Sequence, residues 1–347
     1  MSSISKAPPL IPPGFWYQKI YNFFLYDIFY TVIISVVAIW KEVTVRAPVL
    51  QVDTMEKRTG QVAVLTGGPR GLALGLIKTL VRLDYDIIMG VRNIEDSKKR
   101  LDEFAKSNSK LCFNKITFLE MDLKSLKSMR NFAADVLNKV SRIDLLLCNA
   151  AVMKTPYELT EDGFESQFQI NYLSHFLLTH LLKDKIKATA ALKKSPCQII
   201  YTSSVVHSYG EVDFNELEKC SVYNSTKNYL PTKLCQVIGM LTFQNMMLEE
   251  EAQVNCYAVH PGLIPTELWY DAGGNFLGRF GHIFSGLLRS VQNGADTILW
   301  PAFSPEYQNR GGLYMESGLA INIVSKALDK EVQSKLYAKS KELTGIR

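Results

Sequence analysis

The chain has 347 residues, of which 47% are hydrophobic and 21% charged, so it can bury a large core and is not a disordered protein. Its net charge of +5 is spread over 39 basic residues without a long basic run, so nucleic-acid binding is not expected. The six cysteines contain no Cys-x-x-Cys pair and the five histidines show no zinc-ligand spacing. We therefore expect no metal site.

A long apolar run near the amino terminus is typical of a membrane anchor. Its 21 residues, 20–40, contain one acidic side chain, Asp27. As a helix the run would span about 31 Å, which matches a hydrocarbon core of about 30 Å. A cleaved signal peptide, or a helix lying on the membrane or on the domain, are the alternatives. We expect three segments here: an irregular arm at 1–19, a single-pass transmembrane helix at 20–40 and a polar linker at 41–59.

From residue 60 to 347, short apolar runs alternate with stretches of helical spacing. Two of the helical stretches are 125–140 and 160–182, with Ser125 and Thr160 as expected N-caps. Strands separated by 10–20 helical residues are typical of a parallel sheet covered on both faces, so we expect one doubly wound α/β domain. The expected strands are 61–65, 86–90, 115–119, 143–148, 198–202 and 254–259.

A glycine-rich segment, Thr66 to Ala73, follows the first expected strand and opens a helix. Gly67, Gly68 and Gly71 allow a tight turn in which the backbone can approach a diphosphate closely. The helix N-terminus that follows supplies free N–H groups and the positive end of a dipole. The position after the first strand therefore favours a dinucleotide-binding loop over an ordinary turn.

The end of the second strand bears on which dinucleotide is bound. NAD-specific enzymes place an acid there, but this chain reads Met89-Gly90-Val91-Arg92-Asn93. Arg92, together with Arg70 in the glycine loop, suits the extra phosphate of NADP. We expect NADP, with NAD and two solvated loop arginines as the alternatives.

Two segments have the spacing Tyr-x-x-x-Lys. Tyr229 with Lys233, and Tyr223 with Lys227, would each lie on one face of a helix. A phenol with a pKa near 10 needs a neighbouring ammonium to act as an acid or base near neutral pH. Pro231 is acceptable beside such a pair if the helix begins near Asn228, because N–H groups of the first turn have no helical partner.

The glycine loop resembles the Thr-Gly-x-x-x-Gly-x-Gly signature of short-chain dehydrogenases/reductases, with Ala73 in place of the third glycine. Tyr229 lies 25 residues after Ser204 and 32 before Pro261, which is similar to the retinol-dehydrogenase-like branch. This spacing favours Tyr229 over Tyr223. The closing segment 336–345 also resembles polyprenol-dehydrogenase-like members. The resemblance covers 61–347 and implies a single Rossmann domain.

The resemblance implies a role for individual residues. Ser204 would bind the substrate oxygen, and Asn171 would hold a water of the proton relay. The implied catalytic set is Asn171, Ser204, Tyr229 and Lys233. The implied cofactor-binding set is Gly67, Gly68, Arg70, Gly71, Leu72, Arg92, Asp122, Leu123, Asn149, Tyr229, Lys233, Pro261, Gly262 and Thr266. Cys148 and Ala151 depart from the family's Asn-Asn-Ala-Gly, which bears on cofactor affinity.

An apolar segment at 268–290 follows the nicotinamide loop, where the family keeps its substrate lid. It is rich in aromatic residues and suggests a lipophilic substrate such as a retinoid, sterol or polyisoprenoid alcohol. A helix pair packed on the core, or the face of a homodimer, is the alternative. We expect an oxidoreductase anchored in the endoplasmic reticulum membrane. The rival is a catalytically idle NADP-binding scaffold or sensor, motivated by Ala73 and Ala151.

Overall fold

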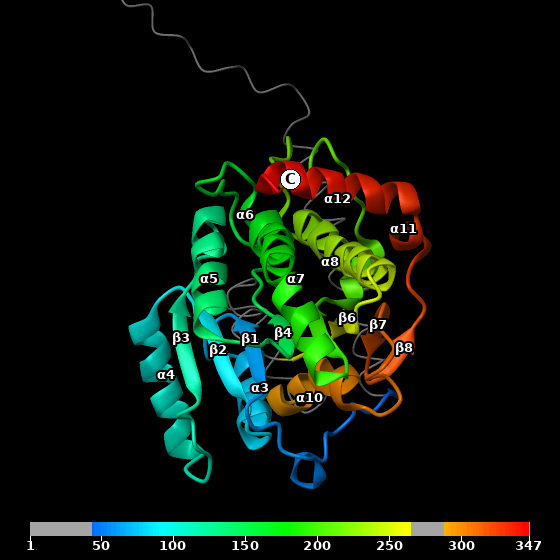
Figure 1. Cartoon of the computed structure of the whole chain (residues 1–347). Coiled ribbons are helices and arrows are strands. Elements are labelled where there is room, and N and C mark those ends of the chain that lie inside the picture. Colours follow the sequence, from blue (N-terminus) through cyan, green and yellow to red (C-terminus); the bar gives the residue numbers. More distant parts are fainter. Residues whose placement is uncertain (1–43, 265–287, 347) are drawn as a thin grey trace, which may run out of the picture.

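An eight-stranded sheet forms the centre of the computed structural model, which describes residues 44–264 and 288–346 (Figure 1). The strand order is β3-β2-β1-β4-β5-β6-β7-β8. In chain order the strands are β1 (Val62–Thr66), β2 (Asp86–Val91), β3 (Ile116–Glu120), β4 (Leu145–Cys148), β5 (Cys197–Thr202), β6 (Val254–His260), β7 (Leu313–Glu316) and β8 (Leu319–Ile321).

The predicted parallel sheet is confirmed for β1 to β7, and all six expected strands are present. β7 and β8 were not predicted from the sequence, and β8 runs antiparallel to β7. β1 and β6 are buried along their whole length, as expected for strands covered on both faces.

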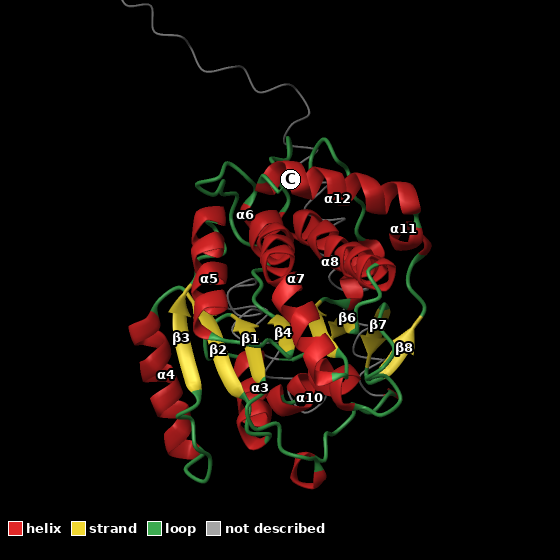
Figure 2. Ribbon diagram, in the orientation of Figure 1, coloured by secondary structure: helices red, strands yellow, loops and turns green. Residues whose placement is uncertain are grey.

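Helices form a layer on each face of the sheet (Figure 2). One layer holds α3 (Leu72–Arg82), α4 (Ile94–Ser107) and α10 (Val291–Phe303). The other holds α5 (Leu126–Lys139), α7 (Ser174–Lys193) and α8 (Ser225–Glu249), with α12 (Lys330–Thr344) packed on α8. The short elements are η2 (Val52–Thr54), α6 (Ser166–Phe168), the π-helix η3 (Gln169–Leu173), η4 (Val205–Tyr209) and α11 (Ser325–Leu328).

β1 contributes to two separate hydrophobic cores, one on each face of the sheet. Val62 and Val64 pack with α5, α7 and α8, whereas Ala63 and Leu65 pack with α3 and α10. Alternate side chains of a strand point to opposite faces, so one continuous apolar run serves both layers.

One expected helix start is wrong, and the condition set for Pro231 is not met. Ser125 caps α5 as predicted, but Thr160 is not an N-cap: its carbonyl accepts from the N–H of Gly163, whose φ of 82° turns the chain, and the helix begins later, at Ser166. α8 begins at Ser225 instead of near Asn228, because the side chain of Asn224 caps it. Pro231 therefore lies inside α8, beyond its first turn.

The polarity of the sheet shows where a ligand would bind. The chain leaves β1 in one direction towards β2 and β3 and later returns to β4 on the other side of β1. In open α/β sheets, ligands bind outside the carboxyl ends of the strands at such a reversal. The segments that follow β1, β2, β4, β5 and β6 carry most of the expected site residues.

The segment expected as a linker is described from Thr44 onward, and its second half belongs to the folded domain. Leu50 and Val52 are buried, and the N–H of Leu50 donates to Asp296 at 3.4 Å. The expected arm at 1–19 and transmembrane helix at 20–40 lie outside the described residues. Among the helices that are described, none is both long and apolar enough to cross a membrane.

Gly75 brings α3 and α10 close together. A Cβ atom at this position would lie 2.7 Å from the Cβ of Ala295 and 2.8 Å from the carbonyl oxygen of Val291. Ala73, which replaces the third glycine of the family signature, is buried with its Cβ atom in place. The glycine needed for close packing in α3 is thus Gly75, which the sequence analysis missed.

We expect Gly75→Ala to lower the free energy of unfolding by about 1–2 kcal/mol. The clash costs about 1–3 kcal/mol and outweighs a helix-propensity gain of up to about 1 kcal/mol. Gly239→Ala in α8 is the matched control, because its Cβ would meet only a ring atom of Tyr172, at 3.1 Å. Thermal unfolding of both variants checks this; an equal or higher midpoint for Gly75→Ala would contradict it.

Candidate active site

The loop between β1 and α3 has the backbone shape that its glycines suggested. Gly67 has a φ of 100° and Gly71 a φ of 49°, conformations that residues with a Cβ rarely adopt. A Cβ on Gly67 would also lie 3.3 Å from that of Ala150. At these glycines the loop presents peptide backbone without side chains.

The N-terminus of α3 lies at the end of this loop. Gly71 is the N-cap, and no side chain among the described residues caps it. Leu72 follows as the first helical residue and is partly exposed. The N–H groups of Ala73 and Leu74 bond the carbonyls of Arg70 and Gly71, at 3.1 and 3.2 Å. The positive end of the helix dipole beside the glycine backbone still suits a diphosphate, so the loop fits the cofactor that the sequence predicts.

The two arginines expected near the extra phosphate are both exposed. Arg92 comes directly after β2, and Arg70 lies in the glycine loop. Asp96, in the first turn of α4, lies 3.8 Å from the Arg70 guanidinium and 2.8 Å from that of Arg100. The hydrogen bond from Arg100 lowers the pKa of Asp96, so this carboxylate is ionised between the two guanidiniums. Sequence analysis did not single out Asp96 or Arg100.

The expected adenine contacts follow β3. Asp122 is half-buried, and its carboxylate accepts from the N–H of Lys124 at 2.9 Å. The N–H of Asp122 donates to the hydroxyl of Ser128 at 2.9 Å. Leu123 is buried, and its carbonyl accepts from the hydroxyl of Ser174 at 2.7 Å. These contacts hold the segment in a defined turn at the carboxyl end of β3.

Thr66 connects the ends of β1 and β4. Its hydroxyl accepts from the N–H groups of Asn149 and Ala150, at 2.9 and 3.1 Å. The side chain of Asn149 accepts in turn from the hydroxyl of Thr202 at 3.2 Å, at the end of β5. Asn149 thus lies between three neighbouring strands, although the chain lacks the family's preceding asparagine.

Tyr229 and Lys233 lie one turn apart on α8, and both are buried. The Lys233 ammonium lies 5.6 Å from the centre of the Tyr229 ring and donates to the carbonyl of Thr202 at 2.9 Å. Burial raises the pKa of Tyr229 and lowers the pKa of Lys233 to about 7, because each charged form loses hydration. The phenol is therefore protonated at neutral pH.

Tyr223, the alternative tyrosine, is used in a loop contact. It lies before α8, where its hydroxyl donates to the carbonyl of Thr155 at 2.5 Å and accepts from the amide of Gln167 at 2.9 Å. Its ring also packs on Tyr157. Lys227, its expected partner, is exposed. The structure thus brings a lysine to the ring of Tyr229, and gives Tyr223 structural partners.

The two serines after β5 have different surroundings. The hydroxyl of Ser203 is buried and donates to the carbonyl of Lys233 at 3.1 Å. Ser204 is partly exposed, and its hydroxyl caps η4 through a 3.4 Å contact with the N–H of Val206. Ser204 is therefore the serine available to a substrate.

Asn171 lies in the π-helix η3, where the helix is locally widened. Its side chain bonds the backbone of Val152 in both directions, at 2.8 and 2.9 Å, and donates to the hydroxyl of Thr232 at 3.1 Å. The backbone carbonyl of Asn171 accepts from the side-chain amide of Gln236 at 2.8 Å and lies 3.1 Å from Nδ1 of His175.

His175 links Asn171 to the phosphate loop. Its Nε2 lies 2.9 Å from the hydroxyl of Thr66. Burial lowers the pKa of His175 to about 4, so the ring is neutral. Because the Asn171 carbonyl can only accept, Nδ1 carries the proton and Nε2 accepts from Thr66. No sequence motif pointed to a role for this histidine.

The loop expected to pack on the nicotinamide is only partly described. Pro261 and Gly262 are buried directly after β6, and Gly262 has a φ of 95°. Thr266 lies outside the described residues, as does most of the expected lid at 268–290. The N–H of Arg289 donates to the carbonyl of Leu263 at 3.0 Å, so the two described ends of this segment lie side by side.

Comparison with known proteins identifies the family to which this geometry belongs. The sequence profile described as short chain dehydrogenase matches residues 61–273. The chain belongs to the short-chain dehydrogenase family. It is an oxidoreductase that acts on CH–OH groups, and its branch is retinol-dehydrogenase-like.

Individual relatives agree with this assignment. The dehydrogenase is 35% identical to retinol dehydrogenase 13 of Mus musculus over 297 residues, 83% of this chain and 84% of the relative. It is 32% identical to polyprenol dehydrogenase of Danio rerio over 294 residues, covering 84% and 89%. An NADPH-bound carbonyl reductase from chicken fatty liver shares the fold, with a TM-score of 0.56 at 20% identity, covering 78% and 100%.

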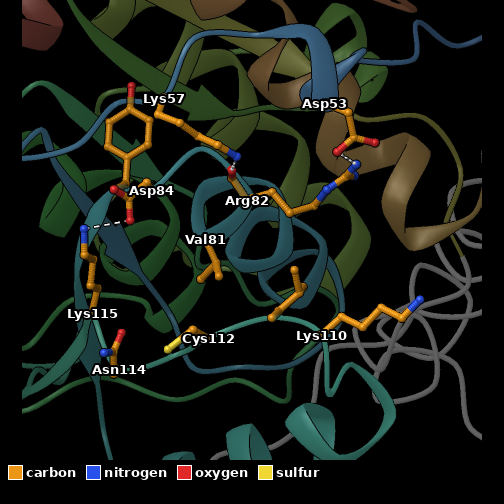
Figure 3. A pocket seen from close by; sticks show the side chains of 11 residues that line it. Asp53, Lys57, Val81, Arg82, Asp84, Lys110, Cys112, Asn114 and Lys115 are labelled. Carbon is orange, nitrogen blue, oxygen red and sulfur yellow. Dashed lines mark hydrogen bonds and ion pairs between the residues drawn. The ribbon is translucent and has the colours of Figure 1, made fainter.

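A cleft of about 420 Å³ in this dehydrogenase lies away from the candidate site (Figure 3). It is at the amino ends of β2 and β3, near Asp84 and Lys115, whereas the site residues follow the carboxyl ends. Four of its six charged side chains form ion pairs, Lys115 with Asp84 at 2.7 Å and Arg82 with Asp53 at 2.6 Å, and Lys57 donates to the carbonyl of Arg82. This pairing is consistent with a solvated structural surface.

Proposed function

We propose that this dehydrogenase transfers a hydride between NADP(H) and a lipophilic alcohol or carbonyl compound. The observation that carries the proposal is the placement of Tyr229 and Lys233 on one face of α8, with the accessible Ser204 at the end of β5. This arrangement places a proton donor and a hydroxyl group at the carboxyl edge of the sheet.

The cofactor would lie along that edge. Its diphosphate would bind the loop of Gly67, Gly68, Gly71 and Leu72, and Arg70 with Arg92 would bind the extra phosphate. When bound, the nicotinamide supplies or accepts the hydride. We assign the remaining cofactor contacts to Asp122, Leu123, Asn149, Lys233, Pro261, Gly262 and Thr266.

The protein's own part in the reaction is proton transfer. In carbonyl reduction the Tyr229 hydroxyl donates its proton to the substrate oxygen while the hydride reaches the carbon, so one O–H and one C–H bond form. Ser204 would hold that oxygen, and Lys233 would stabilise the phenolate left behind. Alcohol oxidation is the same sequence reversed. The raised pKa of Tyr229 favours the protonated phenol that reduction requires.

We propose a retinoid, sterol or polyisoprenoid as substrate and a single-pass anchor at 20–40 in the endoplasmic reticulum membrane. Support comes from the aromatic composition of 268–290 and the apolar length of 20–40. Relatives named retinol dehydrogenase and polyprenol dehydrogenase support the same substrate class. We also propose a homodimer, without assigning its interface.

The test is cofactor turnover by the full chain in lipid nanodiscs. Retinaldehyde, a keto-sterol and a polyisoprenoid aldehyde are offered with NADPH, and the matching alcohols with NADP. We expect turnover with at least one pair, followed as absorbance of the reduced nicotinamide. Tight NADPH binding without turnover on any pair would instead support an idle scaffold or sensor.

A further inference from the structure

Gln236 bridges two residues of the proposed catalytic set. It lies three residues after Lys233 on α8 and is buried. Its side-chain carbonyl accepts from the Lys233 ammonium at 3.1 Å, and its amide nitrogen donates to the backbone carbonyl of Asn171 at 2.8 Å. Both ends of the amide are therefore used.

The surroundings permit only one orientation of this amide. The reversed orientation would place an NH₂ group against the Lys233 ammonium and an oxygen against the Asn171 carbonyl. Two donors would then face each other at Lys233 and two acceptors at Asn171, and burying these polar groups unpaired would be costly. The Asn171 carbonyl takes the NH₂ group of Gln236, so the oxygen of the same amide faces the Lys233 ammonium.

We propose that Gln236 is a positioning residue that holds the Lys233 ammonium in place, using Asn171 as its own support. This inference rests on the proposed function. The Gln236 amide connects Lys233 directly to the backbone carbonyl of Asn171, the residue that the resemblance implies for the proton relay.

The proposal predicts how the ionisation of Lys233 depends on Gln236. The ammonium has two acceptors, the carbonyls of Thr202 and Gln236, which offset its lost hydration. The titratable groups facing it are the Tyr229 phenol on α8 and the His175 ring on α7. The phenol titrates at higher pH and His175 near pH 4, so a transition between about pH 5 and 9 that is lost in Lys233→Met reports Lys233.

The experiment measures NADPH affinity against pH, by protein fluorescence, for the full chain in nanodiscs. It requires no substrate, so it is independent of turnover. Lys233→Met supplies the background curve, which includes the phosphate of NADPH titrating near pH 6. The test variants are Gln236→Leu, which removes the acceptor, and Gln236→Glu, which keeps the size and adds a charge. Gln244→Leu is the matched control, because this other buried glutamine of α8 bonds only the backbone of Val254 and Cys256.

We expect the Lys233 midpoint to fall by about one to two pH units in Gln236→Leu, since a hydrogen bond to a charged group is lost. It should rise in Gln236→Glu and stay unchanged in Gln244→Leu. If Gln236 were only structural, its replacement would change the unfolding temperature. The two Gln236 variants would then not shift the Lys233 midpoint in opposite directions. If Gln236→Leu does not fold, the direction seen in Gln236→Glu decides.

One outcome would overturn the role of Gln236 alone, and another would overturn the place of Lys233 in the cofactor site. An unchanged midpoint in both Gln236 variants, with the transition lost in Lys233→Met, would overturn the role of Gln236 alone. A wild-type curve that Lys233→Met leaves unchanged would remove Lys233 from the cofactor site. That result would overturn the proposed site as well as this inference.

Discussion

Replacing Tyr229 by Phe is expected to reduce kcat/KM by about 10²–10⁴-fold, because only the phenol oxygen carries the transferred proton. The ring remains, so its packing beside Lys233 and the affinity for NADPH should change little. Steady-state rates with the substrate found in the nanodisc assay, and NADPH binding by fluorescence, check the two halves of this expectation.

Tyr223→Phe is the matched control for that experiment. It removes the same atom from a tyrosine six positions earlier, where the hydroxyl bonds Thr155 and Gln167. We expect lower stability, by about 1–3 kcal/mol for the lost contacts, and a retained rate per folded molecule. If Tyr223→Phe were the inactive variant and Tyr229→Phe the active one, the assignment of the acid would be wrong.

A preference for NADPH over NADH is the second large effect we expect. Each charge-assisted contact to the extra phosphate contributes about 1.5–3 kcal/mol, or about 10–150-fold in affinity. Arg92→Ala should therefore lower the ratio of kcat/KM for NADPH over NADH by that factor. The constants for NADH should be nearly unchanged, because that cofactor has no phosphate at this position.

Arg82→Ala provides a control at the other end of the sheet. Arg82 is also a partly exposed arginine, but it pairs with Asp53 at the cleft beside the amino ends of the strands. Its replacement should leave the cofactor ratio unchanged. Equal use of both cofactors by the wild type, or a ratio insensitive to Arg92→Ala, would speak against NADP as the physiological cofactor.

Features that depend on neighbouring residues along the chain were well predicted. The six expected strands are present, because short, mostly apolar runs between polar helices suit a sheet covered on both faces. Helix boundaries were less certain. Thr160 was misplaced as a helix start because the chain turns at Gly163. The cap at Asn224 starts α8 before Asn228, so Pro231 does not lie in the first turn as it would have to for its missing N–H to cost nothing.

Short strands near the carboxyl end were not predicted. β7 and β8 have four and three residues, and a turn at Ser317 and Gly318 joins them into a hairpin. Runs this short carry little periodicity of their own. β7 forms a strand because β6 offers it a free edge to pair with.

By itself, the sequence determined the doubly wound fold, the glycine loop after β1 and the pairing of Tyr with Lys one helical turn apart. These features follow from spacing within a few residues. The tertiary structure alone decided that Ser203 faces α8 while Ser204 is accessible, and that Tyr223 bonds a loop. It also decided that Gln236 and His175 meet at the carbonyl of Asn171. Apart from the contact of His175, these contacts join residues far apart in the chain, so they depend on how α8 packs against its neighbours on one face of the sheet.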